Sequence, residues 1–269
     1  MYDLNEAHHK NWLRAFVSVP NNTFDLCVTS PPYYNARKYG AEWDTFKSPD
    51  DWLFFCKAMV LTIAEVLKPE GVLWWNTGSG YMGGKRLSVV EKLIVEVEEQ
   101  GVYMIDKIPW VKTSFLPKKY SNRPYPAWEE NIIFSREPKH ARYYADHVRE
   151  PYAESTLKRL KYKVGNLQAD EAGNFTKRKM VTPHPDGKAP ANYLKLNVDT
   201  TKRDHPAPMA PELANWAIRA YSKEGDYILD PMCGVGTTLL EAQKLDRIFL
   251  GFDVNPEYVE EANRCLITT

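Results

Sequence analysis

The chain has 269 residues, is 43% hydrophobic and carries equal numbers of acidic and basic residues. This composition predicts a globular protein with a substantial core and excludes a disordered chain. No apolar run approaches the roughly 18–20 residues of a membrane helix, and the polar N-terminus does not look like a secretory signal. The four cysteines form no C-x-x-C pair, so we expect reduced thiols, no zinc site and an intracellular location.

The net charge of zero hides an uneven distribution. Residues 112–203 contain 19 lysines and arginines against 10 acidic residues, a net charge of +9, which leaves −9 for the rest of the chain. Basic residues interleaved with tyrosine suit contact with phosphate, although ordinary solvated charge is the alternative. The expected nucleic-acid contacts are Lys118, Lys119, Arg123, Lys158, Arg159, Lys161, Lys177, Arg178 and Lys179.

The first part of the chain alternates short apolar runs with helical patterns. After a small opening helix within residues 3–19, we expect strands over 24–28, 72–75 and 102–105. Between them lie expected helices over 50–67 and 86–100 and a glycine-rich loop over 78–84. Alternation of this kind predicts a parallel sheet covered by helices.

The pattern breaks after residue 110, apart from one more expected strand over 132–134. Order returns near residue 208 with helices over 211–221, 239–245 and 255–262 and strands over 227–229 and 248–252. A long irregular tract is unusual in a compact domain and is often functional. We therefore expect a catalytic domain made of residues 1–111 and 204–269, interrupted by a binding region over 112–203.

The strand over 24–28 leads into Thr29, Ser30, Pro31, Pro32 and Tyr33. Two consecutive prolines make a stiff, non-helical tip at the carboxyl end of a strand, where open α/β sheets bind ligands. The tip offers a hydroxyl, free carbonyls and an aromatic ring. These groups suit a flat ligand with an exocyclic amine, such as a flipped nucleobase. A proline-rich turn without function is the other interpretation.

A second motif follows the strand over 227–229. Gly234 and Gly236 open a helix, and Asp253 follows at the end of the next strand, as in a nucleotide-type cofactor site. Leu239 replaces the third glycine of the dinucleotide pattern, and Asp230 would repel a pyrophosphate. S-adenosylmethionine, which has a sulfonium and an amine but no phosphate, suits the motif better. The candidate cofactor residues are Asp230, Pro231, Met232, Cys233, Gly234, Gly236, Thr237, Thr238, Asp253, Asn255 and His205.

Together, Thr29–Tyr33, the segment at His205 and the run from Asp230 to Thr238 resemble three motifs of the DNA amino-methyltransferases. Their order matches the permuted beta arrangement of that family, with a variable recognition region in the middle. The resemblance covers residues about 24–110 and 205–266. It implies a Rossmann-like, doubly wound methyltransferase sheet with an inserted basic target-recognition region.

The resemblance also implies roles for the first motif. Ser30 and the Pro31 carbonyl would hold the target amine, Pro32 would stiffen the tip, and Tyr33 would stack on a base flipped out of double-stranded DNA. A serine in the first position is typical of N4-cytosine enzymes, whereas aspartate or asparagine is typical of N6-adenine enzymes. We expect N4-cytosine methylation, with N6-adenine as the alternative, by a monomer or homodimer in the cytoplasm of a prokaryote, in a restriction–modification or epigenetic role.

Other interpretations are weaker. C5-cytosine chemistry needs a cysteine after proline, and no cysteine here follows a proline. An NAD-dependent oxidoreductase and a DNA-binding relative without activity stay open. Asn76 and Thr77 end a strand and could line the cofactor pocket. Asp25, at the start of an apolar run, is better explained as structural than as catalytic.

Overall fold

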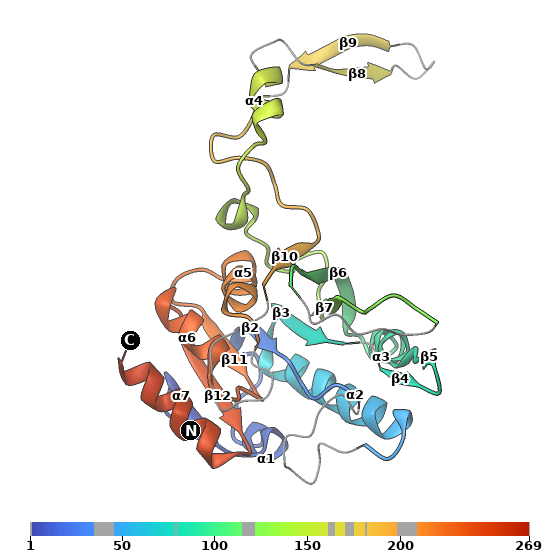
Figure 1. The fold of residues 1–269 in the computed structure, drawn as a ribbon. Helices are drawn as coiled ribbons and strands as arrows, with labels where there is room; N and C mark the ends of the chain where they lie inside the picture. The colour runs from blue at the N-terminus through green and yellow to red at the C-terminus, as the bar shows by residue number, and fades with distance from the viewer. Residues whose placement is uncertain are drawn as a thin grey trace. The chain divides into compact units, whose positions relative to one another are not determined.

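The computed structural model describes residues 2–34, 46–78, 80–114, 122–160, 165–169, 175–180, 182–197 and 209–268. The chain divides into two compact units (Figure 1). Unit 1 combines Met1–Tyr143 with Asn192–Thr269, and unit 2 is Tyr144–Ala191. Within the described ranges, no helix is both long and apolar enough to cross a membrane.

Unit 1 is built on a sheet whose described part has eight strands, in the order β1-β12-β11-β2-β3-β7-β6-β10. All neighbours pair in parallel except β7, which is antiparallel to both β3 and β6. The carboxyl ends of the parallel strands therefore share one edge, here called the carboxyl edge, with the amino end of β7. The strands are β1 (Glu6–His9), β2 (Phe24–Thr29), β3 (Leu67–Thr77), β6 (Tyr103–Lys112), β7 (Trp128–Ser135), β10 (Leu194–Leu196), β11 (Tyr227–Asp230) and β12 (Ile248–Asp253).

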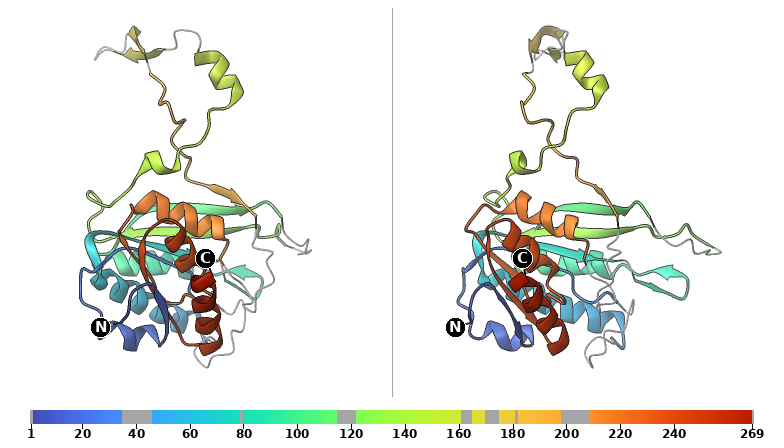
Figure 2. Two further views of the ribbon diagram at one scale, coloured as in Figure 1. Left: turned by 90° about the vertical axis from the view of Figure 1, so that its left-hand side faces the viewer. Right: turned by 60° about the vertical axis from the view of Figure 1, so that its left-hand side comes forward.

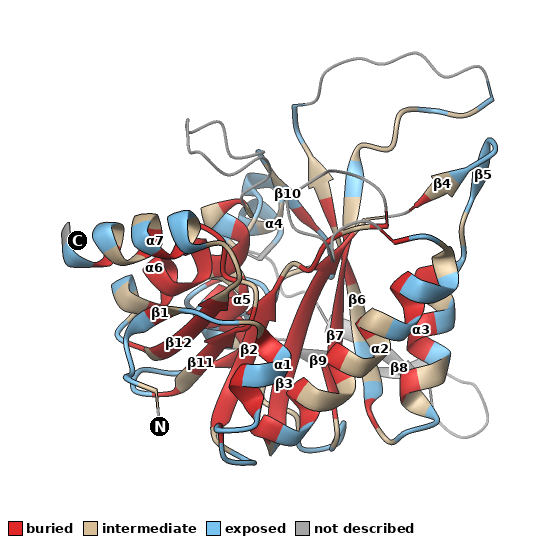
Figure 3. Cartoon of the chain, turned by 90° about the horizontal axis from the view of Figure 1, so that it is seen from below, coloured by how far each residue is buried: buried red, intermediate tan, exposed pale blue. Residues whose placement is uncertain are grey.

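Helices cover both faces of this sheet. One face carries α1 (Trp12–Phe16), α2 (Pro49–Val66) and α3 (Val89–Glu98), and the other carries α5 (Pro211–Tyr221), α6 (Thr237–Lys244) and α7 (Pro256–Thr268). Figure 2 shows α6 and α7 in front of the strands when that side faces the viewer. Because both faces are covered, the central strands are buried along their length, as the red strands of Figure 3 show.

The start of α2 follows from its sequence. Ser48 accepts a hydrogen bond from the Asp51 N–H, and the Asp51 carboxylate accepts one from the Ser48 N–H. This reciprocal capping box satisfies two N–H groups that a helix start leaves without partners. It fixes the position at which α2 begins, after the segment that follows the Pro-Pro tip.

Among the residues that the structure describes, two small hairpins lie outside the main sheet. In unit 1, β4 (Tyr81–Met82) pairs with β5 (Lys85–Arg86) in the glycine-rich segment. In unit 2, β8 (Gly165–Ala169) pairs with β9 (Phe175–Met180), after the short helices η2 (Ala145–Val148) and α4 (Glu154–Leu160). An antiparallel backbone bridge between Glu150 and Lys188 joins the first and last segments of unit 2.

The doubly wound sheet and most of its long helices agree with the sequence prediction. The three strands from which a parallel sheet was predicted, now β2, β3 and β6, do run in the same direction, whereas β7, predicted without a direction, runs antiparallel. The strands β1 and β10 were not predicted, since strands of three or four residues contain too little alternation to recognise. Unit 2 is also narrower than the predicted region 112–203, because β7 and β10 belong to the main sheet.

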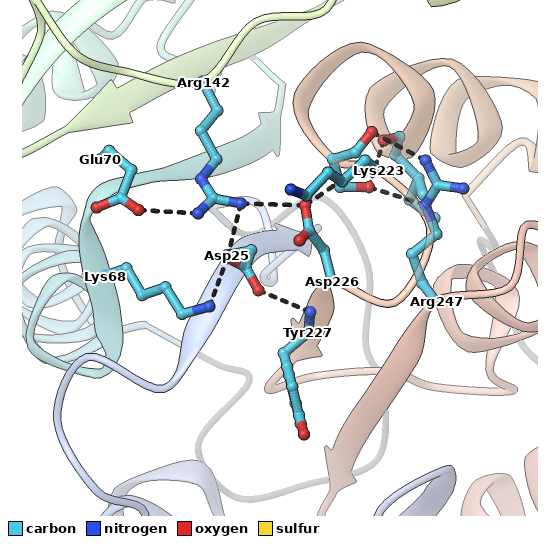
Figure 4. Close-up of polar contacts among 10 residues, drawn as sticks. Asp25, Lys68, Glu70, Arg142, Lys223, Asp226, Tyr227 and Arg247 are labelled. Carbon is cyan, nitrogen blue, oxygen red and sulfur yellow. Dashed lines mark hydrogen bonds and ion pairs between the residues drawn. The ribbon is translucent and has the colours of Figure 1, made fainter.

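Asp25 lies at the start of β2, away from the carboxyl edge, and its side chain is 1% exposed. Its carboxylate accepts from Lys68 Nζ at 2.7 Å, pairs with Arg142 Nη1 at 2.8 Å and accepts from the Tyr227 N–H at 2.8 Å (Figure 4). These contacts join β2, β3 and β11 to the segment after β7. They support the structural interpretation of Asp25, and they engage one of the arginines counted in the basic region.

Candidate active site

The Pro-Pro tip extends from the end of β2 at the carboxyl edge. Pro31 and Pro32 are buried, whereas Ser30 and Tyr33 are partly exposed. The Trp52 indole N–H, from α2, donates to the Pro32 carbonyl at 2.8 Å. This bond anchors the tip to the helix layer and leaves the Ser30 and Tyr33 side chains at the surface of the site.

Tyr33 is held at both ends of its side chain. A Cβ atom on Gly78 would lie 2.7 Å from the ring, so the ring packs directly on the backbone after β3. The Tyr33 hydroxyl lies 2.6 Å from Asn76 Oδ1 and 2.7 Å from Glu129 Oε2. Glu129 also pairs with Lys112 at the end of β6. The tip is thus tied to β3, β6 and β7, whose relevant ends meet at the carboxyl edge.

The loop between β11 and α6 requires its two glycines. Gly234 has φ +50° and Gly236 has φ +82°, in the left-handed region that favours glycine. A Cβ on Gly236 would also lie 2.8 Å from the Ala262 Cβ. The Gly234 N–H donates to Asp253 Oδ2 at 2.9 Å, so the loop lies against the end of β12. The other oxygen of Asp253 accepts from the Asn255 N–H at 2.9 Å.

Asp230 is a buried carboxylate at the end of β11. Burial raises its pKa to about 7, and hydrogen bonds from the Thr238 hydroxyl, the Met232 N–H and the Thr29 hydroxyl oppose that rise. Burial likewise raises the pKa of Asp253, while backbone N–H groups lower it. The two carboxylates, at the ends of β11 and β12 on either side of this loop, therefore form a site that favours a cationic ligand.

The raised pKa of Asp230 predicts a pH-dependent stability of the ligand-free protein. The folded state binds the proton more tightly than the unfolded state does, so this group stabilises the fold below pH about 4 and its contribution is lost as the pH rises towards 7. Asp230→Asn, which does not titrate, should lack this loss. Urea unfolding midpoints of both proteins at pH 5, 6, 7 and 8 check this. Parallel pH profiles would contradict it.

A small hollow at the carboxyl edge brings the two motifs together. One side of the hollow is Ser30 of the tip, and the other is the loop that joins β11 to α6. Its lining residues are Ser30, Met209, Asp230, Met232, Cys233, Gly234, Val235, Thr237 and Thr238. The hollow therefore brings a hydroxyl of the first motif next to the predicted cofactor loop, which lies more than 200 residues away in the sequence.

The groups around this hollow fit S-adenosylmethionine. The buried Asp230 carboxylate suits the amine or the sulfonium, and the glycine loop lets the backbone approach a ligand closely. The Asp253 carboxylate accepts two backbone N–H bonds and keeps lone pairs for ribose hydroxyls. A pyrophosphate would face the two carboxylates, so the arrangement fits a dinucleotide poorly.

Other predicted residues have varied positions. Pro231 and Asn255 lie beside the hollow's loop and the end of β12 without lining the hollow. His205, Lys118, Lys119 and Lys161 lie outside the described residues. Lys158 and Arg159 are on α4, and Lys177, Arg178 and Lys179 are on β9. The Arg123 guanidinium stacks over the Tyr81 ring, 3.9 Å from its centroid.

Three residues make contacts with the Pro-Pro tip that were not predicted from the sequence. No contact with the tip was predicted for Trp52, and Asn76, which was considered for the cofactor pocket, is not among the residues that line the hollow. Glu129 precedes a strand predicted only over 132–134. Its position could not be inferred, because only the antiparallel direction of β7 brings its first residues to the carboxyl edge.

Comparison with known proteins agrees with this geometry. The DNA methylase family of N6/N4 methyltransferases matches residues 24–264. Among curated proteins, the type II methyltransferase M1.MboII of Moraxella bovis is 30% identical over 273 residues, covering 98% of this chain and 96% of the relative. M.HpaI of Haemophilus parainfluenzae is 27% identical, covering 95% of this chain and 72% of the relative.

Solved structures share the fold. The cytosine-N4-specific PvuII DNA methyltransferase aligns with a TM-score of 0.71 at 19% identity, covering 97% of this chain and 85% of that one. The M1.HpyAVI–SAM complex aligns with a TM-score of 0.58 at 19% identity, covering 96% and 98%. With a family match across most of the sequence and a relative covered almost end to end, this chain belongs to the DNA methylase family of N6/N4 methyltransferases.

Proposed function

We propose that the protein transfers the methyl group of S-adenosylmethionine to the exocyclic N4 amine of cytosine in double-stranded DNA. The observation that carries this proposal is the hollow shared by Ser30 and the β11–α6 loop. It places a tip suited to an amine beside a loop suited to a sulfonium donor. The order of the two motifs along the chain supports the permuted, beta arrangement.

The proposed reaction is a direct transfer. The amine nitrogen attacks the methyl carbon, the N–C bond forms as the S–C bond breaks, and one amine proton leaves to solvent. S-adenosylmethionine supplies the activated methyl group. The chain's own contribution is to position the amine and to accept its N–H bonds at Ser30 and the Pro31 carbonyl, because the free amine is a poor nucleophile. Tyr33 supplies a ring on which the flipped base can stack.

Two observations favour cytosine N4 over adenine N6. Ser30 stands in the first position of the tip, where the family resemblance associates serine with N4-cytosine enzymes, and the PvuII neighbour is named as cytosine-N4-specific. N6-adenine methylation by the same mechanism is the second candidate. A restriction–modification role is in keeping with the type II methyltransferases among the relatives. The family match argues against the oxidoreductase interpretation. The other alternative, a DNA-binding relative without activity, predicts that no methyl group is transferred in the assay below.

The experiment is to incubate the protein with labelled S-adenosylmethionine and mixed-sequence duplex DNA, and then to analyse the nucleosides by mass spectrometry. We expect N4-methylcytosine, formed about tenfold more slowly with Ser30→Ala because one hydrogen bond to the amine is lost. N6-methyladenine alone would reverse the choice of base and leave the rest standing. Label in RNA but not in DNA would refute the proposed substrate.

The basic residues of unit 2 are proposed as part of the DNA contact. Lys158 and Arg159 are exposed on α4, with Lys158 Nζ 3.1 Å from Glu154 Oε1. Replacing Lys158, Arg159 and Lys161 by glutamine should weaken DNA binding. It should also lower the slope of log K against log[salt] by roughly 0.9 for each phosphate that the variant no longer neutralises. Binding titrations at several salt concentrations measure both quantities.

The matched control removes three positive charges elsewhere. Arg14, Lys57 and Lys92 lie on α1, α2 and α3, and replacing them by glutamine gives the same change in net charge. We expect the control to keep the salt slope of the unaltered protein. If the slope falls equally in the two triple variants, the cluster on α4 is not part of the DNA contact.

A further inference from the structure

The hydroxyl groups of Ser30 and Tyr33 meet at one side chain, Asn76, at the end of β3. Asn76 is 1% exposed. Its Oδ1 lies 3.0 Å from Ser30 Oγ and 2.6 Å from the Tyr33 hydroxyl. Two residues of the tip are thus bonded to a single buried amide, and the direction of that amide decides what each hydroxyl can do.

The orientation of Asn76 is fixed by its buried neighbour on β7, Asn131. The Trp74 indole N–H, which can only donate, lies 3.1 Å from Asn131 Oδ1. The Asn131 Nδ2 group lies 2.9 Å from the Ile108 carbonyl, which can only accept. These two partners assign the oxygen and the nitrogen of Asn131 without ambiguity, because exchanging them would break both bonds.

The orientation of Asn131 in turn determines which side-chain atom of Asn76 is nitrogen and which is oxygen. The Asn76 atom that lies 2.9 Å from Asn131 Oδ1 must be its nitrogen, because that oxygen needs a donor. The Asn76 oxygen therefore points at the Pro-Pro tip. An amide oxygen accepts and does not donate, so the Ser30 hydroxyl must donate its proton to Asn76.

We propose that Asn76 is a positioning residue, because its oxygen accepts the proton of the Ser30 hydroxyl and so fixes the direction in which that hydroxyl donates. This proposal rests on the proposed methyl transfer. A hydroxyl has one proton. With that proton on Asn76, Ser30 presents only lone pairs to the hollow and receives an N–H of the target amine. Ser30 then gives no hydrogen bond to the ring nitrogen beside the amine. The hydroxyl therefore selects an amine donor, which cytosine and adenine both have, and does not itself distinguish the two bases.

The test is a double-mutant cycle on single-turnover methyl transfer, with Ser30→Ala and Asn76→Leu, which keeps most of the buried volume. Each single change should slow transfer about tenfold, the scale of one lost hydrogen bond. The double variant should be no slower than either single variant, because both changes remove the same oriented acceptor. If Ser30→Ala slows transfer by the same factor in the Asn76→Leu variant as in the unaltered protein, the proposal is overturned.

Two further variants separate positioning from stability. Asn76→Asp keeps an acceptor towards Ser30, so Ser30→Ala should still cost about tenfold in that background. Ser135→Ala removes a buried hydrogen bond to the Gly71 carbonyl at the other end of the β3–β7 pair, 3.0 Å long. It should lower the unfolding midpoint without changing the transfer rate. An equal loss of transfer rate in Ser135→Ala would mean that Asn76 acts only through stability.

A measurement without DNA keeps this inference separate from the proposed function. The Asn76 side-chain N–H signals in NMR, assigned by their absence in Asn76→Leu, should exchange with solvent far more slowly than those of exposed asparagines. Fast exchange would overturn the orientation. Slow exchange together with no methyl transfer to any DNA would refute the proposed function and leave the orientation of Asn76 intact.

Discussion

Asp25→Ala is expected to lower the free energy of unfolding by about 3 kcal/mol, near the lower end of the range for breaking a buried ion pair. The change leaves the Tyr227 N–H without its acceptor and removes a partner from Lys68 and Arg142. The loss stays near the lower end because Arg142 keeps Glu70 and Asp226, at 2.8 and 3.1 Å. For a protein of this size, the thermal midpoint should fall by roughly 6–12 °C.

The matched control is Glu96→Ala. Glu96 pairs with Lys57 at 3.0 Å, but both side chains are about one third exposed. An exposed pair of this kind contributes about 0–1 kcal/mol. Thermal and urea unfolding of both variants measure how much each substitution lowers the free energy of unfolding. If Asp25→Ala costs no more than Glu96→Ala, then the buried cluster of Figure 4 does not stabilise the sheet.

Asp253→Ala is expected to weaken S-adenosylmethionine binding by about 1.5–3 kcal/mol, the scale of a lost hydrogen bond to a charged group. This corresponds to roughly 10- to 150-fold in Kd. The carboxylate holds the Gly234 N–H of the cofactor loop and is proposed to accept from the ribose hydroxyls. The lost binding free energy therefore has two sources: the direct contact with the ribose and the hydrogen bond that orders the cofactor loop. Calorimetric titration of the folded variant with S-adenosylmethionine measures it.

Glu257→Ala is the control for this binding prediction. Glu257 is exposed in the first turn of α7, four residues beyond Asp253, and its removal changes the net charge by the same amount. We expect its Kd to match that of the unaltered protein. An unchanged Kd in Asp253→Ala, with the unfolding midpoint preserved, would exclude Asp253 from the cofactor site.

The sequence predicted the parts of the site that depend on local chemistry. Two prolines after an apolar run can only form a stiff tip, and a Gly-x-Gly segment between a strand and a helix forms a loop wherever it occurs. The structure has both features, and it adds that Ser30 and the cofactor loop line one hollow. The structure also pairs β2 with β11 in parallel, so the two motifs lie at the same edge of the sheet.

The contacts of Asn76 and Glu129 could not be predicted in this way. Both depend on β7 being antiparallel, which places Asn131 opposite Asn76 and brings Glu129 to the tip. The direction of one strand is decided by how the whole chain returns to the sheet, and no local pattern encodes it. The extent of unit 2 depends on tertiary structure in the same way, because β7 and β10 are strands of the main sheet although they lie within the predicted region 112–203.

The order of the strands in the sheet has a consequence for synthesis on the ribosome. Among the described strands, β1 pairs with β12 alone, with Glu6 opposite Leu250, and β2 pairs with β11, with Cys27 opposite Leu229. The strand β1, and the edge of β2 that faces β11, must therefore wait for more than 200 further residues before these partners emerge, although the other edge of β2 can pair earlier with β3. Closing such distant pairings is slow, and it leaves apolar strand edges open in the nascent chain. We expect the growing polypeptide to depend on chaperones until residue 253 has left the exit tunnel, and to gain its cofactor site only then.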